Sequence, residues 1–259
     1  MTALLRADGL AKAFGGVQAL QGCTIEVDEG SVTGLIGPNG SGKTTLFNVM
    51  TGYERVDAGD VFLGGRKITN SPPDRVFALG VGRTFQLTRI FARLTVLENM
   101  LVPAPRRSAA GRRSLPGAKR AAPPDRQRAM ELLDFVGIAG HAAALAGTLS
   151  YGQRKLLELA YVLIAEPAVI LLDEPAGGVN PSLINHIAGR IRELNAGGTT
   201  FLIVEHNMEF VMGLCERVTV MDSGSVVASG PPDIIRTDPR VLDAYLGGSL
   251  EDEDDVTAG

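Results

Sequence analysis

The chain has 259 residues, of which 45% are hydrophobic and 21% are charged, a composition typical of globular proteins. This length suffices for one large domain or two closely packed subdomains. The formal net charge of −4 excludes binding to nucleic acid or to an anionic membrane through overall positive charge. No apolar run approaches the roughly 20 residues that cross a bilayer, and the first ten residues lack the apolar segment of a secretion signal. We therefore expect any membrane role to be exercised through a partner.

The predicted elements alternate between strand and helix along most of the chain. Strands are expected from alternating or short apolar runs at 23–27, 31–36, 60–68 (a hairpin around Gly64-Gly65), 168–172, 199–204, 218–221 and 226–228. Helices are expected at 43–51, 72–79, 94–101, 126–136, 152–164 and 181–194. This alternation predicts an α/β fold whose sheet is parallel at its centre.

Two segments have the composition of irregular structure. Residues 103–124 are rich in Pro, Ala, Gly and Arg with few large apolar side chains, which predicts a mobile basic surface loop. Contact of this loop with lipid headgroups or with a partner is the alternative. The tail at 248–259 is acidic and is expected to be disordered. Cys23 and Cys215 match no metal-ligand spacing, so we expect free, buried thiols.

A glycine-rich loop between the strand at 31–36 and the helix at 43–51 predicts triphosphate binding. It satisfies G-x-x-x-x-G-K-[ST] as Gly37-Pro38-Asn39-Gly40-Ser41-Gly42-Lys43-Thr44. Glycines allow backbone N–H groups to converge on phosphate oxygens, and the following helix directs its N-terminus at them. Lys43 is expected at the β- and γ-phosphates and Thr44 on Mg²⁺. A chance glycine-rich turn is the alternative, which the flanking elements disfavour.

Polar side chains also follow two apolar strands farther along the chain. Asp173 and Glu174 end the apolar run at 169–172, where two carboxylates are costly unless they meet a cation or transfer a proton. Asp173 suits the Mg²⁺ shell through water, and Glu174 is placed to orient an attacking water. His206 follows the strand at 199–204, where it could contact the γ-phosphate. His141 and His186 have no such placement and are expected at the surface.

The order of these motifs resembles that of ABC transporter nucleotide-binding subunits. Leu149-Ser150-Tyr151-Gly152-Gln153 resembles the signature LSGGQ, Gln86 the Q-loop, Ala176-Gly177-Gly178-Val179-Asn180 the D-loop, His206 the switch histidine and Phe14 the adenine-stacking aromatic. The resemblance extends from about residue 5 to residue 247. Tyr151 and Asn180 depart from the general motif, and both resemble variants of the branched-chain amino acid importer ATPases. The segments 84–87, 94–99 and 238–247 also resemble that subfamily.

The resemblance implies a fold and a domain organisation. The fold class is α/β, a P-loop NTPase-type ABC ATPase core with an antiparallel β arm and an inserted α-helical subdomain. Residues 1–86 and 164–247 would form the RecA-like ATP-binding core with its β arm. Residues 87–163 would form the helical subdomain that carries the signature motif and the basic loop, and Gln86 would couple the site to the membrane by moving with it.

The resemblance also implies ATP and Mg²⁺ as cofactors and assigns residues to them. ATP would contact Phe14, Val17, Gly37, Pro38, Asn39, Gly40, Ser41, Gly42, Lys43, Thr44 and Thr45. The ATP of a second subunit would contact Ser150, Tyr151, Gly152 and Gln153, with the Ser150 hydroxyl and the Gly152 N–H on its γ-phosphate. Thr44, Gln86 and Asp173 would hold Mg²⁺, while Glu174, His206, Gln86 and Lys43 would act in hydrolysis.

The implied function is ATP hydrolysis that energises an ABC importer of branched-chain or other hydrophobic amino acids. The expected partners are two transmembrane permease subunits, a second ATPase subunit (itself or a homologous chain) in a head-to-tail dimer and, indirectly, an extracytoplasmic solute-binding protein, with no nucleic acid. The expected location is peripheral, at the cytoplasmic face of the cell membrane.

Several alternatives keep part of this interpretation. The same ATPase could serve urea, short amides, another hydrophobic amino acid or a lipid exporter, because other subunits select the cargo. A non-transport ABC ATPase acting on nucleic acid or ribosomes is disfavoured, since the chain has neither a long coiled-coil insertion nor a second ATPase domain. A regulatory module without hydrolysis is disfavoured by the presence of Gln86, Glu174 and His206.

Overall fold

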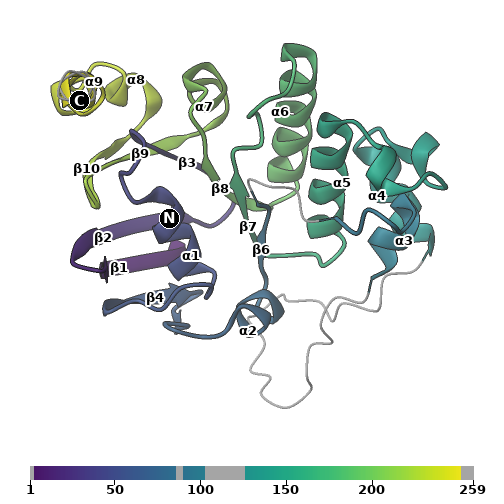
Figure 1. Ribbon diagram of the computed structural model, residues 1–259, viewed down its shortest axis with the longest axis horizontal. Helices are drawn as coiled ribbons and strands as arrows, with labels where there is room; N and C mark the ends of the chain where they lie inside the picture. The colour runs from purple at the N-terminus through teal and green to yellow at the C-terminus, as the bar shows by residue number, and fades with distance from the viewer. Residues whose placement is uncertain (1–2, 86–89, 103–125, 252–259) are drawn as a thin grey trace, which may run out of the picture.

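The computed structural model describes residues 3–85, 90–102 and 126–251, which form two β-sheets and a set of helices (Figure 1). The strands of the first sheet, in spatial order, are β2 (Val17–Asp28), β1 (Ala3–Phe14), β4 (Ala58–Leu63) and β5 (Arg66–Lys67), all antiparallel. The strands of the second, in spatial order, are β10 (Ser225–Gly230), β9 (Arg217–Asp222), β3 (Val32–Ile36), β8 (Thr200–Val204), β7 (Val169–Asp173) and β6 (Val81–Arg83).

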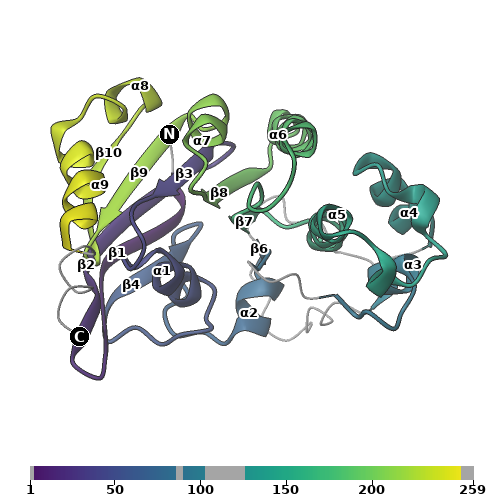
Figure 2. The same cartoon turned by 45° about the horizontal axis from the view of Figure 1, so that its top comes forward.

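Helices cover both faces of the second sheet and form a separate group at one end of the molecule (Figures 1 and 2). They are α1 (Lys43–Met50), α2 (Pro73–Ala78), α3 (Val96–Leu101), α4 (Arg126–Phe135), α5 (Tyr151–Leu163), α6 (Pro181–Ala196), α7 (Met208–Leu214), α8 (Pro232–Ile235) and α9 (Pro239–Glu251), with 3₁₀ turns at Ala139–His141 and Ala146–Thr148. Among the helices in the described ranges, none combines the length and hydropathy needed to cross a membrane.

The centre of the second sheet is parallel. β3 pairs with β8 and β9, and β7 pairs with β6 and β8, all in parallel register, while only β10 runs antiparallel to its neighbour β9. Val204 at the end of β8 aligns with Leu35 of β3 on one side and with Asp173 of β7 on the other. The segments that leave the carboxyl ends of β3, β7 and β8 therefore start from one edge of the sheet.

Alternate residues of the central strands enter two different hydrophobic cores. Val169 and Leu171 of β7 pack with α1 and the antiparallel sheet, and α1 lies beside β1 and β4 in both views (Figures 1 and 2). Ile170 and Leu172 face the opposite side, where helices cover them. A strand buried on both faces needs a continuous apolar sequence, which the run from 169 to 172 supplies.

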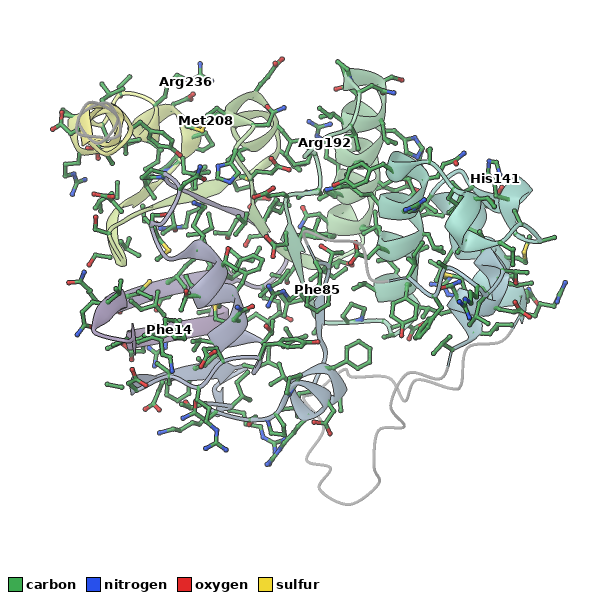
Figure 3. The ribbon with its side chains drawn as sticks, viewed as in Figure 1. Phe14, Phe85, His141, Arg192, Met208 and Arg236 are labelled. Atoms are coloured by element: carbon green, nitrogen blue, oxygen red, sulfur yellow. The ribbon has the colours of Figure 1, made fainter. Side chains whose placement is uncertain are left out.

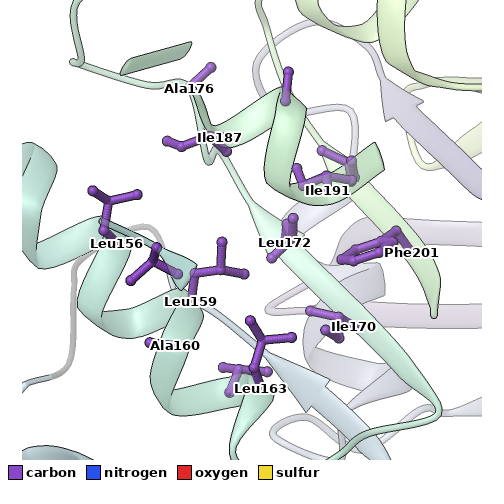
Figure 4. Packing of buried hydrophobic residues seen from close by; sticks show 14 of the residues in the cluster. Leu156, Leu159, Ala160, Leu163, Ile170, Leu172, Ala176, Ile187, Ile191 and Phe201 are labelled. Atoms are coloured by element: carbon purple, nitrogen blue, oxygen red, sulfur yellow. The ribbon is translucent and has the colours of Figure 1, made fainter. Parts of the chain in front are cut away.

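The helix that follows the signature motif packs directly on the sheet. Leu159 and Leu163 of α5 lie against Ile170 and Leu172 of β7, with α6 beside them (Figure 4). At the first turn of α5, a Cβ added to Gly152 would lie 2.3 Å from the Leu183 side chain, so α5 and α6 approach closely there. This contact fixes the start of α5 against the start of α6.

The structure confirms the α/β fold and each helix and strand expected within the described residues, with shifts of a few residues at their ends. It adds β6, α7, α8 and α9, which the patterns did not predict, and near the N-terminus it has two long strands, β1 and β2, where the sequence analysis placed only the strand at 23–27. Helix α9 extends to Glu251, so the first four residues of the expected disordered tail are helical. Gln86, the basic loop at 103–124 and residues 252–259 lie outside the described residues. The division at residues 86 and 163 stays a prediction.

Both cysteines are free and buried, as expected. Burial raises the pKa of the Cys23 and Cys215 thiols to about 12. Because the thiolate is the reactive form, we expect both thiols of the folded protein to resist labelling by a disulfide reagent at pH 8. Unfolding in urea should make both react within minutes, and rapid labelling of the native chain would contradict this packing.

Candidate functional site

The glycine-rich loop after β3 has a backbone path that only glycine follows without strain. Gly37, Gly40 and Gly42 have φ values of +150°, +79° and +98°. A Cβ at Gly37 would lie 2.1 Å from the Met221 carbonyl oxygen, and one at Gly42 would lie 2.4 Å from the Ala19 carbonyl oxygen. The loop therefore packs against backbone on two sides. Between these contacts Asn39 and Gly40 are exposed, which leaves the outer part of the loop open to a ligand.

Lys43, at the start of α1, folds back onto this loop. Its Nζ donates to the carbonyl oxygens of Gly37 and Pro38, each at 2.8 Å, and to Ser41 Oγ at 3.3 Å. Burial lowers the pKa of Lys43, and the nearby carboxylates of Glu174 and Asp173 oppose that shift. The ammonium group and both carboxylates thus share one electrostatic site, as the sequence predicted. Thr44 is exposed beside Lys43 and Thr45 is half-buried.

Asp173 is buried at the end of β7 and paired with Arg83 of β6. Arg83 Nη2 donates to Asp173 Oδ2 at 3.1 Å, and the Asp173 N–H donates to Thr84 Oγ1 at 3.1 Å. Burial raises the pKa of Asp173, while the Arg83 charge and hydrogen bond act in the opposite direction. The Arg83 charge thus compensates the cost of burying the Asp173 carboxylate in the protein interior.

Arg83 is a site residue that the sequence analysis did not single out. Its Nη1 donates to Asn48 Oδ1 at 2.8 Å and Thr51 Oγ1 at 2.9 Å. Its guanidinium also lies over three aromatic rings, at 5.6 Å from Phe47, 5.6 Å from Tyr53 and 4.9 Å from Phe85. These hydrogen bonds and ring contacts hold the guanidinium in place, and through it the Asp173 carboxylate.

Glu174 and His206 meet across the ends of β7 and β8. His206 Nε2 lies 3.0 Å from Glu174 Oε1, so the histidine contacts the carboxylate directly. Glu174 has a φ of +49°, an uncommon left-handed conformation for a residue with a side chain, and its N–H donates to the Val204 carbonyl at 2.9 Å. Both side chains reach solvent at the sheet edge, where the sequence placed them.

The buried Glu205 organises the backbone around this pair. Its Oε1 accepts from the Ala176 N–H at 2.5 Å, and its Oε2 accepts from the N–H groups of His206 and Asn207 at 3.0 and 3.2 Å. One carboxylate thereby joins the loop after β7 to the loop after β8. In the sequence, Glu205 is a charged residue directly after an apolar strand. This pattern predicts neither that its side chain is buried nor that it accepts three hydrogen bonds.

The signature motif forms the capped N-terminus of α5. Ser150 Oγ accepts from the Gln153 N–H at 3.3 Å, and Gln153 Oε1 accepts from the Ser150 N–H at 2.9 Å, which makes a capping box. Gln153 Nε2 lies 2.9 Å from His141 Nε2. Tyr151 is 45% exposed, and Asn180 caps α6 through the Leu183 N–H at 2.9 Å. The helix start is thus formed within this chain and is open to solvent.

Phe14 and the signature motif lie on opposite sides of the molecule. Phe14 and Val17 pair across the Gly15-Gly16 turn and are 45% and 70% exposed. In Figure 3, Phe14 lies on the antiparallel sheet and His141, the neighbour of the signature, lies in the helical group at the other side of the molecule. His141 is at the surface as expected, whereas His186 is half-buried with Nε2 3.1 Å from the Val136 carbonyl oxygen.

The chemistry of the site suits Mg²⁺ bound together with a triphosphate. Within the described ranges no three His, Cys, Asp or Glu residues are arranged to hold a metal by themselves. Thr44 and Asp173 provide a hydroxyl and a carboxylate oxygen near the loop. Mg²⁺ prefers one or two protein oxygens completed by substrate phosphates and water, and this donor set fits that preference.

Comparison with known proteins defines the class that this fold and site belong to. The ABC transporter family model matches residues 20–177, and the model for the branched-chain amino acid ATP-binding cassette transporter matches residues 225–251. The chain belongs to the ABC transporter family of ATP-binding cassettes. It is a nucleotide-binding ATPase of this family, as the order of its motifs predicted.

The relatives extend this result over nearly the whole chain. The high-affinity branched-chain amino acid transport ATP-binding protein LivG of Salmonella typhimurium is 39% identical, covering 94% of this chain and 98% of LivG. The corresponding protein BraF of Pseudomonas aeruginosa is 37% identical, covering 94% and 98%. MJ1267, an ATP-binding cassette of an ABC transporter solved in its ADP conformation, has a TM-score of 0.82 and 36% identity, covering 95% of this chain and 100% of that chain.

A further solved relative is a dimer. MJ0796, a bacterial ABC transporter cassette, has a TM-score of 0.74 and 25% identity, covering 88% of this chain and 98% of that chain. These similarities confirm the fold class and the family. The individual roles of the site residues stay predictions.

The Arg83–Asp173 pair yields a stability prediction. Replacing Arg83 with Met leaves a buried carboxylate without its cation, and we expect the free energy of unfolding in urea at pH 7 to fall by about 3 kcal/mol. The matched control is Arg6→Met, because Arg6 pairs at 3.5 Å with Asp8 on the surface, where side-chain exposures are 41% and 52%. That change should cost no more than about 1 kcal/mol. Equal losses for the two variants would contradict the assignment of Arg83.

Proposed function

We propose that this chain is the ATP-hydrolysing subunit of an importer for branched-chain or other hydrophobic amino acids. The observation that carries the ATPase chemistry is the convergence of Lys43, Asp173 and Glu174 on one edge of the parallel sheet. The transport assignment is supported by the relatives, which are named for branched-chain amino acid transport and which this chain matches over almost its full length.

The glycine-rich loop would bind the triphosphate. Its exposed N–H groups and the N-terminus of α1 offer donors and positive potential for phosphate oxygens. The Lys43 ammonium group donates to the carbonyl oxygens of Gly37 and Pro38 and to Ser41 Oγ. Oxygens of the β- and γ-phosphates would replace some of these acceptors. Phe14 and Val17 would provide the exposed surface for adenine.

Three side chains would hold the metal, and Glu174 would direct the water. Mg²⁺, bound by the Thr44 hydroxyl and, through water, by Asp173, would neutralise charge that develops on the phosphates. Gln86 belongs to this proposed set from the sequence. Glu174 would accept a hydrogen bond from the attacking water, whose oxygen forms the new bond to the γ-phosphorus as the bond to ADP breaks. His206, 3.0 Å from Glu174, would hold that carboxylate and contact the γ-phosphate.

The position of the signature motif favours a second ATPase subunit. Ser150 caps α5 and Tyr151 begins it. His141, which contacts Gln153 of the motif, lies on the opposite side of the molecule from Phe14 (Figure 3). A helix N-terminus exposed there can meet an anion held by another chain. We therefore propose a head-to-tail dimer in which Ser150, Tyr151, Gly152 and Gln153 contact the ATP of the second subunit, itself or a homologous chain. ATP would close this dimer, and loss of the γ-phosphate would let it reopen.

The proposed assembly includes two transmembrane permease subunits and, through them, an extracytoplasmic solute-binding protein. This chain would lie peripherally on the cytoplasmic face of the membrane and would bind no nucleic acid. The net charge of −4 is consistent with a subunit that reaches the membrane through protein contacts.

Glu174→Gln tests the chemistry and the assembly together. We expect a complex purified from the membranes of its host through a tag on this chain to contain two multi-span subunits and a second ATPase chain.

In the Glu174→Gln complex, the glutamine amide cannot accept the proton of the water as the carboxylate does. The hydrolysis rate at sites that use Glu174 should therefore fall at least about 100-fold, with ATP affinity within about twofold. Unchanged steady-state hydrolysis would refute the role of Glu174. Recovery of the chain alone from the soluble fraction would refute the importer.

Phe14→Ala tests the adenine platform. Base–aromatic stacking contributes about 1–3 kcal/mol, so titration with a fluorescent ATP analogue should show an affinity loss of roughly 5- to 150-fold. Phe62→Ala on the same sheet is the control, since Phe62 lies in β4 under the Arg6 guanidinium. Equal affinity for Phe14→Ala and the wild type would exclude Phe14 from the nucleotide site.

A further inference from the structure

Lys155 is a buried cation that the functions described so far leave unexplained. It lies on α5, two residues after the signature motif, and is 8% exposed. Its Nζ donates to the backbone carbonyl oxygen of Glu174. Burial of an ammonium group is unfavourable unless its donors are satisfied, so a lysine at this position marks a specific contact rather than a space-filling side chain.

The contact is made to the residue with the strained backbone. Glu174 has a φ of +49°, and its N–H is held by the Val204 carbonyl of β8. Lys155 holds the carbonyl of the same residue from α5, together with the Gly177 N–H at 3.1 Å. A left-handed non-glycine residue persists when its surroundings hold it in place. Lys155 therefore acts on the backbone orientation that aims the Glu174 carboxylate.

Tyr151 connects this lysine to the exposed end of the signature motif. The Lys155 Nζ lies 5.4 Å from the centroid of the Tyr151 ring, within the range of a cation–π contact. The same ring borders the D-loop, since a Cβ on Gly178 would lie 3.2 Å from Tyr151 Cε1. Tyr151 is 45% exposed, so a second subunit can reach it. A glycine at this position would make neither of the two ring contacts.

A second polar contact ties the same helix to the neighbouring strand. Glu158, buried and three residues after Lys155, accepts from the Phe85 N–H at 2.9 Å. Lys155 and Glu158 thus bind the segments that follow β7 and β6. Leu159 packs on the sheet beside them, so polar and apolar contacts attach α5 to both segments (Figure 4).

We propose that Tyr151 and Lys155 form a positioning relay from the signature motif of this chain to its own Glu174. This rests on the proposed head-to-tail dimer. In that dimer the signature touches the ATP of the second subunit, whereas Glu174 serves the ATP bound to this chain. Engagement of Tyr151 by one site would set the backbone of Glu174 in the other, so the relay couples hydrolysis at the two sites. Lys155 is a positioning residue, since its Nζ contacts the Glu174 carbonyl.

The test measures ATP hydrolysis by the full complex carrying variants of this chain. Lys155→Met keeps the apolar stem and removes the ammonium group, and kcat should fall at least about tenfold because Glu174 is misplaced. KM and ATP affinity should stay within about twofold, since Lys43 and the loop are untouched. Lys155→Arg should restore most of the rate. Lys67→Met, on a 60% exposed side chain, is the matched control and should leave the rate unchanged.

The tyrosine half of the relay is tested by a double-mutant cycle. Tyr151→Leu should lower kcat about fivefold, and Tyr151→Phe, which keeps the ring, should lower it less. The double variant Tyr151→Leu/Lys155→Met should be no slower than Lys155→Met alone, because both changes interrupt one connection. Since Tyr151 is partly exposed, its variants give a result even if Lys155→Met does not fold.

Each outcome decides between the relay and a merely structural role. Effects of Tyr151→Leu and Lys155→Met that multiply would overturn the relay, as would an unchanged kcat or a change confined to KM. A loss that Lys155→Arg does not recover would also overturn it. A wild-type complex without ATP hydrolysis would overturn the proposed function and the relay with it, whereas normal hydrolysis in Lys155→Met overturns the relay alone.

Discussion

The parallel alignment of β3, β8 and β7 is the constraint on which the rest of the structure depends. In parallel strands the carboxyl ends lie at the same edge, so chain segments far apart in sequence leave the sheet side by side. The glycine-rich loop follows β3, Asp173 ends β7 and is followed by Glu174, and His206 follows β8. A shift of one residue in the register would turn Asp173 to the other face of the sheet. Burial of the central strands on both faces opposes that shift, because every position of β3, β7 and β8 is already buried.

The site gathers buried charges, and each has partners that keep it in place. Lys43 binds loop carbonyls, Asp173 binds Arg83, and Glu205 accepts three backbone N–H groups. A buried charge without such partners would destabilise the fold strongly. Some of these partners, above all the loop carbonyls at Lys43, are ones that a triphosphate could replace. The contacts that hold Lys43 against the loop therefore also place its ammonium group where it can meet a negatively charged ligand.

The sequence predicted those parts of the site that are coded locally. The phosphate loop has a fixed spacing of glycines and ends in Lys43, and the apolar run into Asp173 and Glu174 is visible because its residues are consecutive. The hydrophobic pattern likewise predicted the central strands and most helices. What escaped prediction depends on contacts between distant segments. Arg83 meets Asp173 across 90 residues, and Lys155 meets Glu174 across 19. Nothing in the local sequence distinguishes such residues from surface charges.

The same reason explains the elements that the patterns missed. β6 is a strand of three residues whose existence depends on pairing with β7, and α7 has seven residues, too few for a clear helical period. Helix α9 extends into the acidic segment because its first turns pack through Val241, while the composition of the tail alone favours irregular structure. In each case tertiary contact outweighs local preference.

The account is tested most directly by a structure of the membrane complex with a non-hydrolysable ATP analogue and Mg²⁺. It predicts that the Lys43 ammonium group leaves the carbonyl oxygens of Gly37 and Pro38 for the β- and γ-phosphates, with adenine on Phe14 and the second subunit's signature motif on the γ-phosphate. A triphosphate bound elsewhere, with Lys43 still on the loop carbonyls, would contradict the claim that this sheet edge is the site of ATP hydrolysis.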